Sequence, residues 1–225
     1  KEINSTKRTG QISLDGDLEE ADWLNANWTS GFTQMKPFPG EKASKKTEVA
    51  MLFDQEAIYF GVKCYDHPDS ISRVLSLRDD FNPNLDFFGI FLDTYNDKQN
   101  GFFFGLSSRG VQVDAKIFSE DFNDLLNLVW RSKTQINDQG WFAEIKIPYS
   151  ALRFPKSDIQ TWNINFARQT SRFREDNTWS PVNPYLEDYL LESGVVKGIK
   201  DITPPVRLAL IPFLSSYNSF SKDTE

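Results

Sequence analysis

The sequence predicts an all-β chain folded as an antiparallel β-sandwich with one or two short helices, and three observations lead to this fold class. Short segments in which apolar residues alternate with others recur along most of the chain, as is typical of half-buried strands. Short polar turns separate these segments. Aromatic residues make up 14% of the 225 residues, and large side chains suit a core between two packed sheets.

The clearest pair of strands lies in TEVAMLFDQEAIYFGVKCYD, residues 47–66. Apolar residues share one face along residues 49–53 and again along residues 58–64. The polar residues between these arms are few enough for an antiparallel hairpin. Residues 87–92 are apolar on both faces, which indicates a strand covered on both sides, in mid-sheet or under a loop.

The same alternation predicts the remaining strands and the buried core. Further strands are expected at residues 12–14, 32–34, 102–106, 111–118, 129–136, 141–147, 162–169 and 194–200. Eight side chains are expected to be buried, namely Val49, Phe60, Val62, Ile90, Ile145, Ile147, Ile164 and Phe166. Along residues 141–147 the complementary set, which includes Glu144, is expected to face solvent.

Two short helical segments are expected, whereas the first nine residues are polar and are expected to be loosely held. In DLEEADWLNA, Asp17 and Glu20 have the spacing of a capping box, and apolar residues up to Leu24 follow at helical spacing. A single helical turn is expected at residues 149–152, directly after a proline whose missing N–H costs nothing at that position.

Composition excludes several classes of function. A net charge of −7 argues against a nucleic-acid partner, because binding to phosphates needs clustered Lys and Arg. No run of 18 or more apolar residues is present, so no transmembrane helix is expected. Cys64 is the single cysteine and cannot form an intrachain disulfide. His67 is the single histidine, which excludes a zinc site built from several histidines.

An ordered set of motifs carries a resemblance to a known family. The chain contains, in this order, LDGDLEEADW, TEVAMLFDQEAIYFGVKCYD, DFFGIFLDTYNDKQNGFFFGLSSRGVQVD, GWFAEIKIPYSALRF, WNINFARQ and TWSP. This set resembles a family 9 carbohydrate-binding module, in the version found as the N-terminal domain of Bacteroidetes-type outer-membrane β-barrel proteins. The resemblance implies a non-catalytic module at residues 1–200, and a linker with the truncated start of a C-terminal membrane β-barrel at residues 201–225.

The resemblance also implies a location and a set of binding residues. It places the chain in the cell envelope, associated with the outer membrane, with its own barrel as a partner and a saccharide as ligand. Sugar-binding relatives hold a saccharide end between two Trp rings, helped by charged and amide side chains. Trp179 stands at one ring position, and Asp66 and Asn165 fall on two of the polar positions.

The sequence departs from this pattern at three other positions. The second ring position is Pro83, and Gly89 and Gly105 replace a binding Glu and a binding Arg. With one ring instead of two, any binding is expected to be weak, about millimolar. Each predicted binding residue also has a structural interpretation: a loop anchor for the tryptophan, a turn former for the aspartate and a solvated strand face for the asparagine.

A further pattern suits a metal ion. Asp80, Asn82, Asn84 and Asp86 place oxygen ligands at alternate positions, which suits a hard cation such as Ca²⁺ in a structural role. The segment lacks the Gly and terminal Glu of a helix–loop–helix calcium site. An ordinary acidic turn is the alternative interpretation.

Catalysis is not predicted. Any Ser-His-Asp or Cys-His arrangement would have to use His67, which stands in a turn without a nucleophile motif nearby. A glycosidase needs only two carboxylates, and Glu144 with Asp86 or Asp93 is the pair to consider. Three classes therefore remain: a saccharide-binding module, a structural or protein-interaction domain of an outer-membrane protein, and a glycosidase.

Overall fold

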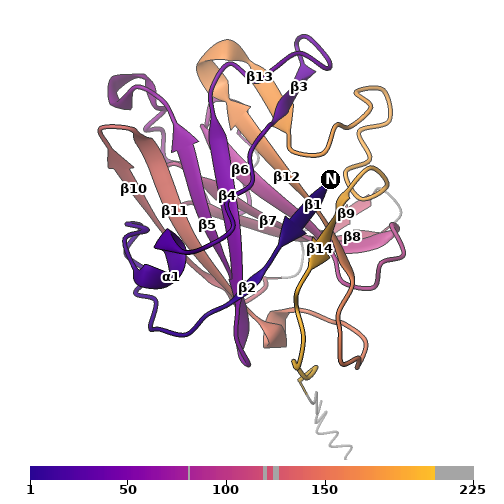
Figure 1. Cartoon of the computed structure of the whole chain (residues 1–225). Helices are drawn as coiled ribbons and strands as arrows, with labels where there is room; N and C mark the ends of the chain where they lie inside the picture. Colours follow the sequence, from indigo (N-terminus) through magenta and orange to yellow (C-terminus); the bar gives the residue numbers. More distant parts are fainter. Residues whose placement is uncertain (81, 119–120, 124–126, 206–225) are drawn as a thin grey trace, which may run out of the picture.

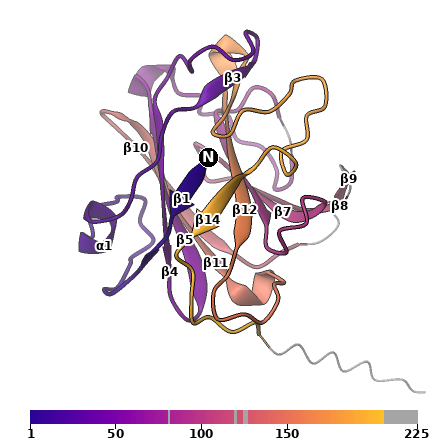
Figure 2. The same ribbon diagram turned by 45° about the vertical axis from the view of Figure 1, so that its right-hand side comes forward.

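The computed structural model describes residues 1–80, 82–118, 121–123 and 127–205, and in this part of the chain two β-sheets pack face to face (Figures 1 and 2). One sheet contains, in spatial order, β1 (Glu2–Asn4), β14 (Gly194–Lys197), β12 (Trp162–Thr170), β6 (Phe87–Asp93), β7 (Asn100–Ser107), β8 (Gln112–Phe118) and β9 (Asp121–Asn123), while β13 (Glu175–Thr178) pairs with β12 and β3 (Thr33–Lys36) pairs with β13. The other contains β10 (Arg131–Asn137), β11 (Gly140–Pro148), β5 (Ala57–Tyr65), β4 (Thr47–Phe53) and β2 (Thr6–Lys7). The chain therefore forms a β-sandwich with very few helical residues, which confirms the predicted fold class.

The core lies between the nine-stranded and the five-stranded sheet. All eight side chains predicted to be buried are fully buried there, because the inward face of each strand meets the inward face of the opposite sheet. The predicted hairpin is β4 and β5, which pair antiparallel from Thr47 opposite Cys64 to Phe53 opposite Ile58. Strand β6 lies in mid-sheet between β12 and β7, which explains why its sequence is apolar on both faces.

The first residues are held more firmly than the sequence predicts. Strand β1 pairs in parallel with β14 in one sheet, and β2 pairs in parallel with β4 in the other. Ile3 is the apolar anchor of this segment, with only 2% of its surface exposed. The prediction of a loose N-terminus is wrong because backbone hydrogen bonding to a sheet edge does not require apolar side chains.

The N-terminal helix is shorter than predicted and faces the sheet differently. Helix α1 spans Ala21–Leu24, its N-cap residue Glu20 makes no capping hydrogen bond, and the predicted capping box is absent. Trp23 is fully buried whereas Leu24 is 70% exposed. The helix lies on the outside of the five-stranded sheet (Figure 2), where Gly61 of β5 leaves room for the Trp23 ring. One tryptophan thus decides which helical face is buried.

Three single turns of 3-10 helix complete the described elements, namely η1 (Pro68–Ser70), η2 (Tyr149–Ala151) and η3 (Ser171–Phe173). The second is the helical turn predicted after Pro148. In the described part of the chain, no helix combines the length and the apolar composition of a membrane-spanning segment. The predicted start of a barrel at residues 206–225 lies outside the described residues.

Candidate functional site

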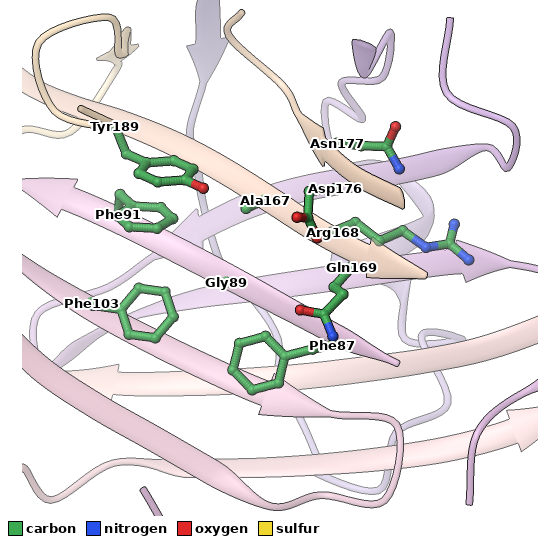
Figure 3. Close-up of a pocket in the computed structure, with 10 residues that line it drawn as sticks. All are labelled: Phe87, Gly89, Phe91, Phe103, Ala167, Arg168, Gln169, Asp176, Asn177 and Tyr189. Atoms are coloured by element: carbon green, nitrogen blue, oxygen red, sulfur yellow. The ribbon is translucent and has the colours of Figure 1, made fainter. Parts of the chain in front are cut away.

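An open depression of about 440 Å³ lies on the outer face of the nine-stranded sheet, away from the core (Figure 3). Strands β6, β7, β12 and β13 form its floor and sides, and the loop that precedes β14 covers one end. Its lining residues are Phe87, Gly89, Phe91, Phe103, Ala167, Arg168, Gln169, Asp176, Asn177 and Tyr189. Volumes of a few hundred Å³ with mostly apolar walls are usual for small-molecule sites.

Strand periodicity and two glycines produce the aromatic floor. Along β6 the side chains at alternate positions point to opposite faces, so Phe87 and Phe91 face outward while their neighbours enter the core. Gly89 and Gly105 are paired across β6 and β7. A Cβ at Gly89 would lie 2.7 Å from the ring of Phe103, and one at Gly105 would overlap the ring of Phe87. The absence of side chains at the two glycines therefore lets both rings lie over the sheet.

The aromatic rings contact one another as a continuous surface. The ring centroids of Phe87 and Phe103 are 6.3 Å apart with the planes 21° from parallel. Phe91 and Tyr189 stack with centroids 4.0 Å apart and planes 2° from parallel. Phe91 and Phe103 are almost fully buried, whereas Phe87 and Tyr189 retain partial exposure and form the surface that a ligand would touch.

Two polar side chains enter the pocket with free acceptor atoms. The Nε2 atom of Gln169 donates to the carbonyls of Pro83 at 2.8 Å and Leu85 at 3.1 Å, which fixes the amide and leaves Oε1 for the pocket (Figure 3). The side-chain carboxyl of Asp176 makes no hydrogen bond or ion pair with any described residue. Burial raises the pKa of its carboxyl; Lys36 nearby lowers it in part, and Glu187 raises it further.

Arg168 and Asn177 line the pocket without directing their functional groups into it (Figure 3). The guanidinium of Arg168 lies between the sheets, where it donates to the carbonyls of Lys46 at 2.8 Å and Tyr65 at 3.1 Å. The amide of Asn177 donates to Glu175 at 2.9 Å. No cationic group of a described lining residue therefore points into the pocket.

The residues that the resemblance implied for sugar binding lie elsewhere. Trp179 is 1% exposed, its Nε1–H donates to Thr29 Oγ1 at 2.9 Å, and its ring packs on Phe166 with centroids 5.5 Å apart. Asn165 is fully buried, donates to the carbonyl of Ser180 at 3.0 Å and accepts from the N–H of Ser180 at 2.9 Å. Both side chains hold the loop after β13 against the sheet, which matches the loop-anchor interpretation of Trp179. The interpretation of Asn165 as part of a solvated strand face is wrong, because this loop covers the outer face of β12 at that position.

Asp66 is the centre of an ion cluster. Its carboxylate accepts hydrogen bonds from both terminal nitrogens of Arg172, at 2.6 and 2.7 Å, and lies 3.4 Å from Lys45 Nζ. Burial alone would raise the pKa of Asp66, but the hydrogen bonds from Arg172 and from the His67 N–H bring it below its ordinary value. With its side chain 1% exposed, Asp66 has no open face for a ligand.

The predicted metal ligands are partly engaged within the chain. Asp86 accepts hydrogen bonds from Ser171 N at 2.9 Å and Ser72 N at 2.9 Å, and Asn82 Oδ1 accepts from Asn84 N at 2.9 Å. The bond between Asn84 and Asn82 is that of a hydrogen-bonded turn, the alternative interpretation, whereas Asp86 ties the start of β6 to two segments distant in the sequence. Calcium binding that includes Asp80 stays a prediction.

One acidic group has ligand atoms close enough to hold a metal. Asp15, Glu20 and Glu144 place one carboxylate oxygen each within 4.8 Å of one another, and they are the only such set among the described residues. Asp15 is exposed, however, and Glu144 already accepts three hydrogen bonds from the chain. The group is an acidic cluster without further evidence of an ion.

The expectation that Glu144 faces solvent is wrong. The side chain is fully buried beneath the segment before β3 and accepts hydrogen bonds from the backbone N–H groups of Asp15 and Gly16, both at 2.9 Å, and from Trp23 Nε1 at 2.8 Å. Burial raises the pKa of Glu144, and these three hydrogen bonds oppose the rise. The strand pattern assigns the side chain to the outer face but does not show that the N-terminal segment covers this face.

The geometry also excludes Glu144 with Asp93 as a glycosidase pair, and Asp86, the other candidate partner, is 3% exposed with its carboxylate bonded to Ser72 and Ser171. Glu144 lies on the outer face of the five-stranded sheet, whereas Asp93 belongs to the nine-stranded sheet and is fully buried. Asp93 accepts hydrogen bonds from backbone N–H groups of its own turn and from Asn163 Nδ2 at 3.0 Å. Two carboxylates on opposite sides of the core cannot flank one glycosidic bond.

Sequence reasoning missed the pocket, although part of its signal was visible. The two-sided apolar pattern of β6 and the glycines at Gly89 and Gly105 are local features. Asp176 belongs to the short strand β13, and Tyr189 to the loop before β14. No local sequence pattern connects these two residues with the residues of β6, which lie about 90 positions earlier in the chain.

Comparisons with known proteins bear on the fold. No protein-family model and no curated protein sequence matches the chain. A family 9 carbohydrate-binding module of Caldicellulosiruptor kristjanssonii, solved with cellotriose, superposes with a TM-score of 0.62 at 16% identity over 96% of this chain and all of the module. The same module with glucose gives a TM-score of 0.62 at 16% identity over 92% and 97% of the two chains.

A protein of Bacteroides uniformis to which carbohydrate binding has been ascribed superposes with a TM-score of 0.70 at 14% identity, over 88% of this chain and 98% of that one. Identities this low establish a shared architecture and nothing finer. The chain therefore has the fold of the family 9 carbohydrate-binding modules.

Proposed function

We propose that the chain is a non-catalytic carbohydrate-binding module that holds a saccharide in the aromatic pocket on the outer face of the nine-stranded sheet. The observation that carries the proposal is the combination of partly exposed rings with unpaired hydrogen-bond acceptors in one depression. The C–H face of a pyranose is flat and apolar and packs well on an aromatic ring. Phe87 and Tyr189 offer such surfaces.

The polar groups of the pocket suit sugar hydroxyls. A hydroxyl donates one hydrogen bond, and both Asp176 and the Oε1 atom of Gln169 are acceptors without a partner among the described residues. Gln169 is also held in place by its two donated bonds, so its oxygen is ordered before a ligand arrives. The shared fold supports the same conclusion, since the Caldicellulosiruptor module was solved with cellotriose and with glucose.

We further propose, on the resemblance of the sequence alone, that the module belongs to the cell envelope as the N-terminal part of an outer-membrane protein with a C-terminal barrel. Limited proteolysis and immunolabelling of intact cells that express the full-length protein would test this location. Labelling of intact cells or of the isolated outer membrane supports it, and recovery in the cytoplasmic fraction contradicts it.

A second function is favoured by a specific observation. Contacts within the chain occupy the side chains of Trp179, Asn165 and Asp66. A proline, Pro83, stands where the sugar-binding relatives have the second ring. A domain that kept the architecture and lost its ligand would look the same at these positions. Its role would then be structural, or would consist of binding another protein.

Isothermal titration calorimetry separates the two functions. The chain is titrated with mono- and oligosaccharides, and the Phe87→Ala variant is compared with Phe38→Ala, which removes a 64% exposed phenylalanine that does not line the pocket. We expect dissociation constants of about 1 mM and a weakening of about fivefold for Phe87→Ala only, equivalent to about 1 kcal/mol. The structural function gains if no saccharide gives heat. Equal binding by both variants and the unmodified chain would place the saccharide outside the aromatic pocket and contradict the proposed site.

A further inference from the structure

The polar lining of the aromatic pocket consists almost entirely of acceptors. Both N–H groups of the Gln169 amide are used by backbone carbonyls, so only its oxygen is available to a ligand. Asp176 is a carboxylate and accepts hydrogen bonds without donating any when it is ionised. The hydroxyl of Tyr189 is the single side-chain donor among the described lining residues whose polar groups face the pocket. A matching ligand therefore supplies several donors at this end.

The charges around Asp176 have a negative balance. The charged groups that act on its carboxyl are Lys36, Glu187 and Glu175, so two acidic side chains and Asp176 itself are set against one basic side chain. Lys36 Nζ is already paired with Glu187 Oε1 at 2.5 Å. Arg168, the other cation beside the pocket, directs its guanidinium between the sheets. An added cation would compensate the unpaired carboxylate, whereas an added anion would be repelled.

The aromatic floor favours the same kind of ligand. The face of an aromatic ring carries partial negative charge and attracts a cation, and the attraction grows when water is partly excluded. Phe87 and Tyr189 present partly exposed rings in the same depression as the Asp176 carboxylate, with Gln169 between Phe87 and Asp176. Rings together with an unpaired carboxylate are a suitable combination for an ammonium group.

We infer that the pocket selects a saccharide that carries a protonated amino group, such as a residue of a glucosamine-type glycan with a free amine, over neutral and acidic saccharides. This inference rests on the proposed function, because it names the sugar class for the same site. The ammonium donates to Asp176 and to Gln169 Oε1, and the C–H face of the ring packs on the aromatic floor. Acetylation of the amine removes the charge and two of the three N–H donors.

The test compares matched sugars on the whole chain. Glucosamine, N-acetylglucosamine, glucose and glucuronic acid are titrated by calorimetry at about pH 6.5, where amines are protonated and most carboxyls are ionised. The variant Asp176→Asn removes the charge and keeps the shape of the side chain. Asp158→Asn is the control, because Asp158 is exposed in a loop, does not line the pocket and makes no side-chain hydrogen bond or ion pair with a described residue.

We expect glucosamine to bind about tenfold more tightly than the other three sugars, since a hydrogen bond to a charged group contributes about 1.5 kcal/mol or more. We expect Asp176→Asn to remove this preference and Asp158→Asn to keep it. Equal affinities for glucosamine and glucose, both weakened by Phe87→Ala, would overturn the inference and leave the proposed function standing. Absence of binding to every sugar would overturn both. Thermal melting of Asp176→Asn shows whether the variant is folded.

Discussion

Replacing Glu144 with alanine should destabilise the fold strongly, although the sequence places this residue on an outer strand face. The carboxylate accepts two backbone N–H groups and the indole N–H of Trp23, which is fully buried and has no access to water. Leaving one buried donor unsatisfied costs about 1–3 kcal/mol. Two of the three donors are well buried, so we expect the free energy of unfolding to fall by about 3–5 kcal/mol.

Urea denaturation followed by tryptophan fluorescence measures this loss, because Trp23 reports on the segment that Glu144 holds. The control is Glu19→Ala, an exposed glutamate in the same segment, which should change the stability by less than about 0.5 kcal/mol. Glu144→Gln should lie between the two, since its amide oxygen still accepts while its NH₂ group opposes the indole N–H. A loss below about 1 kcal/mol for Glu144→Ala would refute the assignment of Glu144 as the anchor of the N-terminal segment.

Three further predictions follow from the same structure. Asp66→Asn should lower the stability by about 2 kcal/mol at neutral pH, because it removes the charge of a buried carboxylate that accepts two hydrogen bonds from the partly exposed guanidinium of Arg172. Since the folded-state pKa of Asp66 is lowered, this contribution is present above the unfolded pKa and is lost as the pH falls through the folded value, so urea melts should show the variant and the unmodified chain converging in acid. Gly105→Ala should displace the ring of Phe87, because the new Cβ would overlap this ring, and should therefore abolish saccharide binding. The melting temperature should fall by an amount equivalent to about 1–3 kcal/mol, and an unchanged melting temperature would contradict the overlap between the Cβ and the ring. If Asp80 belongs to a calcium site, about 1 mM Ca²⁺ should raise the melting temperature of the chain, and Asp80→Asn should remove this rise. Identical melting temperatures in Ca²⁺ and in chelator would favour the acidic turn.

The fold could be read from the sequence because its determinants are local. Alternation along β4 and β5 reports directly on which side chains enter the core, and all eight residues predicted for the core are buried. Strands β1 and β2 were not predicted because they pair through their backbones at sheet edges, where apolar and polar side chains need not alternate. The length of helix α1 was overestimated because the segment packs through the buried Trp23 and not through apolar residues at helical spacing.

The candidate site was less accessible to sequence reasoning, for two physical reasons. A tryptophan in a loop, such as Trp179, has the same local sequence whether it packs inward or offers a ring to a ligand. The period of a strand gives the face of Glu144 and not what covers that face. The pocket, in turn, joins β6, β13 and a loop, so Asp176 meets Phe87 only through tertiary structure.

Chemical-shift mapping locates a bound saccharide on the molecule without assuming an affinity, and so tests whether the aromatic pocket is the binding site. In a two-dimensional ¹H–¹⁵N titration of the labelled chain with a saccharide, we expect saturable shifts at the amides of Gly89, Ala167 and Asn177, which line the pocket. Shifts confined to the amides around Trp179 and Asp66, or no saturable shift with any saccharide, would contradict this expectation.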